Sequence, residues 1–230
     1  MSRRLLGLAV LVVAAAPAAA QDDAAAVVKK AVDAHGGADA LTKFRAGTYA
    51  LKGTMSLAGA DLDFTGDVTY ELPDRFRMTL TSDVAGQKLT VVQVVNGNKV
   101  SNKLNGQAMP VGDAEKAELT KAAAMQDMSQ LVPLLDAARY TLKGEKDETL
   151  NGDPAAVVEV TGKAVKEPVR LFFDKKTGLL VKTSRKGVSP GTGKLKEVLE
   201  ETAMADFKSF NGVKIPTKMV VTHDGKAFMT

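Results

Sequence analysis

The sequence predicts a mainly β protein with a smaller helical part, built as one strongly curved antiparallel sheet of about eleven strands. Three observations predict it. Apolar and polar residues alternate with a period of two in many short segments, turn residues such as Asn-Gly and Asp-Gly separate those segments, and two stretches instead show helical spacing. The sequence contains no internal repeat or interdomain linker, so we expect residues 21–230 to form a single domain.

Residues 1–20 have the layout of a secretory signal peptide. Arg3 and Arg4 precede an apolar run at residues 5–16, and the small residues 18–20 precede the polar residues 21–23. The apolar run is short for a membrane span, and the small residues are typical of a cleavage site. We therefore expect export across the inner membrane and a periplasmic mature chain of residues 21–230, with an uncleaved anchor as the alternative.

Two segments have helical spacing. Residues 24–35 place valines and alanines on one face, and Gly36 and Gly37 follow as a natural stop. The second helix is predicted over residues 113–138, where Asp113 can cap its start and Pro133 should end or kink it near Val132. Its apolar stripe consists of Met125, Met128, Leu131, Val132 and Leu135.

The strands follow from alternation and from the turns between them. Residues 88–95 are more uniformly apolar and predict a central strand, and Asn96-Gly97 predicts a tight hairpin after it. Residues 196–207 also fit a helix, and we favour a strand because strands surround them. The predicted strands are residues 48–57, 64–72, 76–80, 88–95, 99–104, 140–150, 155–161, 169–174, 179–186, 196–207 and 213–223.

Composition excludes several classes of function. The chain has no cysteine and two histidines, His35 and His223, without a third ligand at recognisable metal-site spacing. It has no Gly-x-Ser-x-Gly motif. The formal net charge of +4 falls to +2 without Arg3 and Arg4, and tryptophan is absent, which disfavours a nucleic-acid surface. We expect no catalytic residue, no metal, no cofactor and no nucleic-acid partner.

A large curved sheet with so little helical cover is either a tightly filled barrel or a structure with a concave apolar hollow. We expect a hydrophobic ligand in that hollow, with methionines of the second helix as an adaptable lid. The predicted lining is Tyr49, Leu51, Met55, Phe64, Val68, Tyr70, Phe76, Met78 and Leu80. The predicted lid is Met125, Met128, Leu131 and Leu135, for which ordinary core packing is the alternative.

Two segments resemble the LolA-like family of periplasmic lipoprotein carriers. Residues 66–80 read GDVTYELPDRFRMTL, and residues 94–106 read VVNGNKVSNKLNG. The resemblance rests on a strand that opens with Gly66, on the turn at Leu72-Pro73 and on the hairpin at Asn96-Gly97. The segments AHGGADALTKFRAGTYALKGTM, LFFDKKTGLLVKT and FNGVKIPTKMVV also look like periplasmic relatives of this group, so that the resemblance covers the mature chain.

The resemblance implies an unclosed half-barrel with a helical lid over a hydrophobic cavity that takes acyl chains. The implied function is a non-enzymatic periplasmic carrier or binder of lipid or of lipidated protein. Lipoprotein carriers of this family place an arginine directly before the turn proline, where this chain has Leu72, which favours a broader lipid-binding or sensing role. The alternative is a cell-envelope protein–protein interaction or sensor module with a packed core.

Overall fold

The computed structural model describes residues 17–57, 59–163, 165–190 and 195–230. Within these residues the helical elements are α1 (Pro17–Ala34), α2 (Ala38–Leu41), α3 (Asp113–Met128) and the 3-10 turn η1 (Val132–Leu135). The strands are β1 (Ala46–Leu57), β2 (Ala60–Glu71), β3 (Arg75–Val84), β4 (Gln87–Asn96), β5 (Lys99–Leu104), β6 (Gln107–Met109), β7 (Tyr140–Leu150), β8 (Asp153–Gly162), β9 (Val165–Asp174), β10 (Leu180–Pro190), β11 (Leu195–Phe210), β12 (Val213–His223) and β13 (Lys226–Met229).

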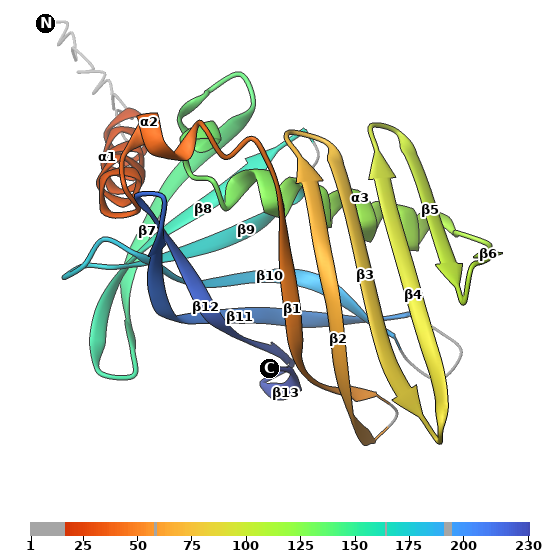
Figure 1. Cartoon of the computed structure of the whole chain (residues 1–230). Helices are drawn as coiled ribbons and strands as arrows, with labels where there is room; N and C mark the ends of the chain where they lie inside the picture. Colours follow the sequence, from red (N-terminus) through yellow and green to blue (C-terminus); the bar gives the residue numbers. More distant parts are fainter. Residues whose placement is uncertain (1–16, 58, 164, 191–194) are drawn as a thin grey trace, which may run out of the picture.

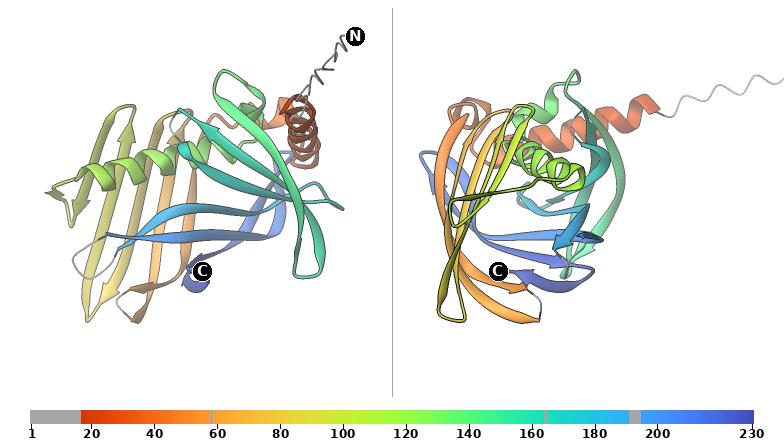
Figure 2. Two further views of the ribbon diagram at one scale, coloured as in Figure 1. Left: turned by 180° about the vertical axis from the view of Figure 1, so that it is seen from behind. Right: turned by 90° about the vertical axis from the view of Figure 1, so that its right-hand side faces the viewer.

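All described strands belong to one antiparallel sheet in the order β6-β5-β4-β3-β2-β1-β13-β12-β11-β10-β9-β8-β7 (Figure 1). The sheet curls without closing, because its edge strands β6 and β7 do not pair with each other. Figure 2 shows α3 lying between the two walls of the curled sheet, with α1 beside it. The predicted fold class is confirmed. The short strands β6 and β13 raise the strand number from about eleven to thirteen, and residues 196–207 lie in strand β11.

The main core lies where α1 and η1 pack on β7, β8 and β9. Val28 and Ala31 of α1 and Val160 and Val169 of the sheet are completely buried there. The helix ends before Gly36, whose φ is 120° and whose absent Cβ would lie 2.1 Å from the carbonyl oxygen of Gly212. Glycine is therefore needed at this position, because the β11–β12 turn packs directly on the end of α1.

The second helix is shorter than the sequence predicts. α3 ends at Met128, and Leu131 has a φ of 62°, which breaks the helical path before η1 begins. Pro133 lies in the first turn of η1, and its ring disfavours the α conformation in the residue before it. The prediction of a helix over residues 113–138 is therefore wrong over residues 129–138. In the part of the chain described, no helix has the length and apolarity needed to span a bilayer. Residues 1–16 lie outside the described residues, and the signal peptide stays a prediction.

Candidate functional site

The nine predicted lining residues lie on one face of the sheet. Cross-strand partners share a face, and Tyr49 is paired with Val68, which is paired with Met78. The neighbouring row contains Leu51 and Leu80, and alternate residues along each strand return to the same face. This is the concave face, because Val68 and Phe76 on it contact α3. The sequence therefore identified a contiguous set of side chains inside the curl of the sheet.

These side chains differ in how far α3 covers them. Leu119 and Ala123 of α3 pack on Val68, Phe76 and Val95, which are buried. Farther along the strands Phe64 is buried, and the other apolar side chains of this face are half-buried. This uncovered part of the concave face, called the apolar wall below, consists of Leu51, Met55, Leu62, Leu80, Leu89, Val91 and Leu104. Four of these residues, Leu62, Leu89, Val91 and Leu104, are not in the predicted lining. Leu62 lies outside the predicted strand over residues 64–72, and no face was predicted for β4 and β5.

The predicted lid residues lie mainly in the core beside α1. Met128 and Leu131 are 1% and 0% exposed within the cluster that joins α1 to β7–β9, and Met125 packs against its border. Leu135 is on the surface. Core packing, the alternative interpretation of this stripe, therefore describes Met128 and Leu131. The α3 residues that cover the concave face are Leu119, Ala122 and Ala123.

The opposite side of α3 is tied to the other wall of the curl by ion pairs. The Arg185 guanidinium on β10 contacts Glu118 of α3 at 2.8 Å and Glu200 of β11 at 2.9 Å. Lys121 of α3 also contacts Glu118 at 2.8 Å. Burial opposes ionisation of Glu118, but the hydrogen bonds from Arg185 and Lys121 outweigh it and hold the pKa of Glu118 below its usual value. The concave side of the sheet, expected to be apolar throughout, thus has one apolar wall and one ionic wall.

His223 extends this ionic wall. Its Nε2 lies 3.3 Å from a carboxylate oxygen of Glu200, its Nδ1 lies 3.1 Å from Oγ of Ser189, and its ring stacks on Phe228 at 3.9 Å. Ser, His and Glu in line resemble a hydrolytic triad. However, Glu200 also binds Arg185, and Ser189 lies in strand β10 rather than in the sharp turn that exposes a nucleophile. The arrangement fits a polar wall better than a catalytic site.

His35 is a buried histidine with its own partners. Nδ1 lies 2.9 Å from the carbonyl oxygen of Ala31, and the ring meets Phe207 edge-on at 5.9 Å. Burial lowers the pKa of His35 despite the bond to Ala31, and the charge of Lys214 lowers it further. Among the described residues, no three or more His, Asp or Glu side chains form a group that could hold a metal ion.

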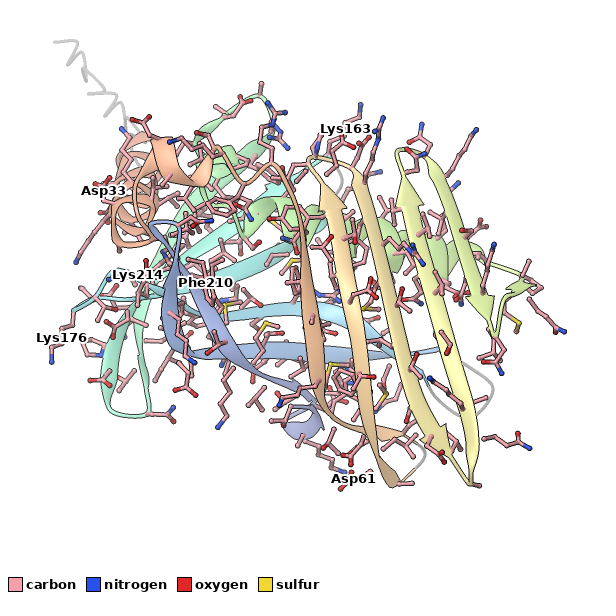
Figure 3. All side chains as sticks on the ribbon, in the orientation of Figure 1. Asp33, Asp61, Lys163, Lys176, Phe210 and Lys214 are labelled. Carbon is pink, nitrogen blue, oxygen red and sulfur yellow. The ribbon has the colours of Figure 1, made fainter. Side chains whose placement is uncertain are left out.

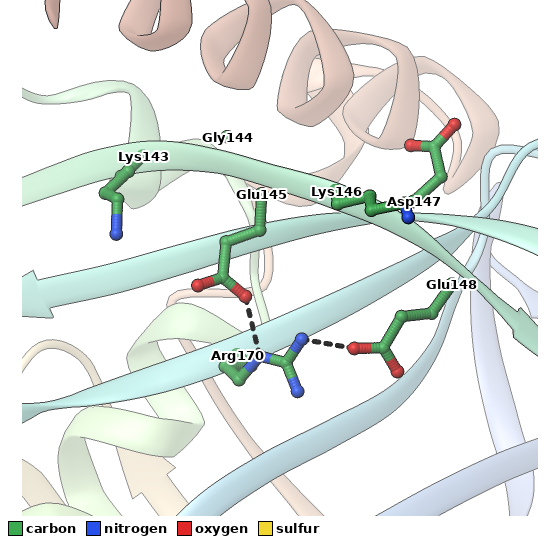
Figure 4. A pocket seen from close by; sticks show the side chains of 7 residues that line it. All are labelled: Lys143, Gly144, Glu145, Lys146, Asp147, Glu148 and Arg170. Atoms are coloured by element: carbon green, nitrogen blue, oxygen red, sulfur yellow. Dashed lines mark hydrogen bonds and ion pairs between the residues drawn. The ribbon is translucent and has the colours of Figure 1, made fainter.

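Among the surface hollows of the described residues, one lies away from the concave face and another includes Tyr70 and Phe76 of the predicted lining. One, of about 390 Å³, surrounds Arg170 on the outer face of β9, opposite the core residues Leu171 and Phe173 (Figure 4). Arg170 is paired there with Glu145 at 2.7 Å and with Glu148, so its charge is satisfied. The other, of about 570 Å³, lies at the ends of β1–β4 and is lined by 12 residues. They are Ala46, Gly47, Thr48, Thr69, Tyr70, Glu71, Arg75, Phe76, Arg77, Val94, Val95 and Asn96.

Solved structures with the same arrangement identify the fold. A LolA superfamily protein from Nitrosomonas europaea aligns over 90% of this chain and 88% of its own, with 14% identity and a TM-score of 0.55. An outer membrane lipoprotein-sorting protein domain from Vibrio parahaemolyticus aligns over 91% and 88%, with 11% identity and a TM-score of 0.51. The chain has the LolA-like fold. A DUF1329 family protein from Desulfovibrio piger also aligns, over 90% and 88%, with 14% identity and a TM-score of 0.52. Neither a protein-family model nor a curated protein matches the chain.

In this LolA-like chain the motif residues occupy tight positions. A Cβ at Gly66 would lie 2.0 Å from the carbonyl oxygen of Thr79, so only glycine lets β2 and β3 approach there. Leu72 precedes the turn proline, and its N–H donates to the carbonyl oxygen of Arg45 at 2.7 Å. Gly97 of the β4–β5 hairpin has a φ of 58°. These residues shape the sheet, and Leu72 supplies no charge to the hollow.

Proposed function

We propose that the protein is a non-enzymatic periplasmic carrier or binding protein that holds lipid, or the acyl chains of lipoproteins, against its apolar wall. The observation that carries the proposal is a contiguous set of side chains, including Leu51, Met55 and Leu80, that share the concave face and stay half-buried. An apolar surface left open inside a fold marks a binding site more often than a defect of packing. Each methylene buried on this wall would contribute about 0.8 kcal/mol.

The placement of α3 supports exchange of such a ligand. The helix rests on β2–β4 through Leu119 and Ala123 and is tied to β10 through Glu118 and Arg185. The apolar contact of Leu119 and Ala123 can be replaced by contacts with an acyl chain, while the ion pair between Glu118 and Arg185 holds the helix to the other wall. We infer that α3 swings from its apolar contact and admits an acyl chain beneath it.

The alternative, an envelope interaction module with a packed core, accounts for one end of the curl. There Met128 and Leu131 fill the space between α1 and β7–β9. It does not account for the half-buried side chains on β1–β5. The LolA superfamily and lipoprotein-sorting neighbours likewise favour a carrier.

The test is to purify residues 21–230 from the periplasm and to detect bound lipid by native mass spectrometry after mild release. Leu80→Gln on the concave face should lower the bound lipid several-fold, because an amide there lacks a partner in the lipid phase. Val92→Gln, on the outward face opposite Thr79, is the matched control and should retain lipid. A lipid-free protein that gains no thermal stability from phospholipid or lipopeptide refutes the proposal, and so does equal loss in both variants.

Export is tested separately. N-terminal sequencing of the periplasmic protein should find a chain that begins at Gln21, because the small residues before it are typical of a cleavage site. An intact N-terminus in the membrane fraction would instead show an uncleaved anchor.

A further inference from the structure

The sheet is joined weakly at one place, where β13 links β1 to β12. Met229 of β13 is paired with Met55, and the N–H groups and carbonyl oxygens of Thr54 and Thr230 bond each other at 2.9 and 3.0 Å. On its other side β13 pairs with β12 at residues 221–223. Beyond β13, β1 and β12 diverge without pairing (Figure 1). The seam is defined here as residues 46–52 of β1 and 213–220 of β12.

The backbone of β1 presents unused hydrogen-bonding groups to the seam. In an antiparallel strand the N–H and C=O of one residue point to the same side, and the side alternates along the chain. Thr54 is turned toward β13, so Thr48, Ala50 and Lys52 are turned toward the seam while Tyr49 is turned toward β2. Within the described residues, no strand pairs with this side of β1 at these positions. Such an edge is a template for another strand.

The facing edge of β12 is protected. Pro216 has no N–H, and it lies in a strand paired with β11 along its length, so the missing donor belongs on the seam side. Two residues earlier, Lys214 donates its N–H to the carbonyl oxygen of His35 and not to β11. Because the side alternates along a strand, the backbone of Pro216 is also turned away from β11. Residues 46–52 of β1 contain no proline. A strand that enters the seam therefore pairs with β1.

The concave side of the seam is apolar. Tyr49 on β1 and Ile215 and Met219 on β12 are 38%, 39% and 38% exposed, unusually high for large apolar side chains within strands. They lie on the concave face, since Tyr49 shares a row with Val68 and since Ile215 and Met219 alternate in step with the core residue Val213. A strand paired with β1 would extend this concave face beside Tyr49.

The outward side of the seam is basic. Lys52, Lys214 and Lys218 are exposed and lie on the face opposite the apolar side chains, and Figure 3 marks Lys214 beside β12. The seam residues themselves include no Asp or Glu. On β2, Asp67 lies opposite Ala50 and Glu71 lies opposite Ala46, but Glu71 is paired with Arg75 at 2.8 Å, and the three lysines outnumber both. Because successive side chains of a strand point to opposite faces, the seam complements a segment in which acidic and apolar residues alternate.

We propose that the seam binds one extended polypeptide segment of a partner protein, with alternating acidic and apolar side chains, which adds to β1 as an antiparallel strand in line with β13. Backbone hydrogen bonds to Thr48, Ala50 and Lys52 supply the affinity, and the two faces of the seam supply the selectivity. The inference does not depend on lipid binding, since it rests on the edge of β1 and not on the apolar wall.

The test uses two synthetic peptides with blocked ends, Thr-Glu-Val-Glu-Thr-Glu-Val and the same sequence with lysine in place of glutamate. Amide hydrogen exchange is followed by NMR on residues 21–230. The acidic peptide should slow exchange at Thr48, Ala50 and Lys52 by about tenfold or more, because these amides become bonded. The exchange rate of the Tyr49 amide should not change, because its N–H is already bonded to β2. The basic peptide should protect none of these amides.

Two variants make the result specific. Ala50→Pro removes one seam-facing donor and spares the ladder between β1 and β2, so the acidic peptide should no longer protect Thr48 and Lys52. Lys218→Glu should weaken the binding of the acidic peptide and allow the basic peptide to bind. The unfolding midpoint of this variant shows whether the variant folds. Lys103→Glu, on the outward face of β5, is the charge-matched control and should bind like the parent. Absent protection, equal protection by both peptides, or undiminished protection in Lys218→Glu overturns the proposal.

Discussion

Replacement of Arg185 by methionine should weaken the attachment of α3 to the ionic wall. The guanidinium is 12% exposed and contacts two carboxylates, Glu118 and Glu200, which are 18% and 20% exposed. A buried charge that loses its partner costs 3–5 kcal/mol, and an exposed pair contributes about 0.2–1 kcal/mol. With these three side chains mostly but not wholly buried, we expect a loss of about 2 kcal/mol. The next residue gives a matched control, since Lys186 contacts Glu197 with both side chains more than 60% exposed.

Urea unfolding measures this loss, and hydrogen exchange shows where it falls. Arg185→Met should lower the free energy of unfolding by about 2 kcal/mol and Lys186→Met by less than about 0.5 kcal/mol. Exchange should accelerate in α3 before the core strands, because the lost contact is one of two among the described residues that tie the helix to β10, the other being the bond from Lys121 Nζ to the carbonyl oxygen of Lys186 at 3.1 Å. A double variant with Glu118→Gln should lose less than the two single changes added, because both remove the same interaction. Equal losses for Arg185→Met and Lys186→Met, or full additivity with Glu118→Gln, would refute the reasoning.

The change of the unfolding free energy with pH on the acid side has a defined sign. Since the pKa of Glu118 is lowered on folding, its ion pairs contribute fully above the ordinary value of 4.5 and the contribution disappears as the pH falls through the folded-state pKa. The unfolding free energy of Glu118→Gln should therefore be flatter on the acid side than that of the parent. Parallel profiles would show that Glu118 gains nothing from its partners.

Three further changes test other parts of the structure. Burial lowers the pKa of His35 below 6.5, so the contribution of His35 to stability is complete above that pH and falls as the pH drops through the folded-state pKa. In this pH range His35→Gln should reduce the slope of unfolding free energy against pH by up to about 1.4 kcal/mol per pH unit. An unchanged slope would contradict the lowered pKa. A Cβ at Gly53 would lie 1.8 Å from the carbonyl oxygen of Thr230, so Gly53→Ala should displace β13 and speed amide exchange at Thr54, and unaltered exchange would contradict the pairing. Phe76→Ala should cost about 3 kcal/mol in urea unfolding because the ring is buried under α3, whereas a loss below about 1 kcal/mol would mean that α3 does not cover it.

Alternation was sufficient to predict which residues share the concave face. Tyr49, Val68 and Met78 fall in one cross-strand row although only sequence parity was used to group them, because side chains in a strand alternate whatever their partners. The hairpin after Asn96 was equally local, since Gly97, the first residue of its turn, has a positive φ. The helical stripe was less informative. Spacing identified Met128 and Leu131 as apolar-facing, but it could not show that they face α1 and not the hollow.

The ionic wall and the seam could not be foreseen. Arg185 meets Glu118 from 67 positions away and Glu200 from 15, and many other pairs of charges in the chain have similar separations. In the same way, the sequence shows an Asp224-Gly225 turn but not where the following strand lies. Its contact with β1 depends on how the whole sheet curls.

The sequence by itself determined eleven of the strands and the turns between them, nine side chains of the concave face and the approximate positions of the two long helices, because those features depend on residues within a few positions of one another. The tertiary structure decided how far the sheet curls, which part of its hollow α3 and α1 fill, and where β1 is left without a partner. Those outcomes depend on the summed twist of thirteen strands and on contacts between residues far apart in the chain, which local periodicity does not record.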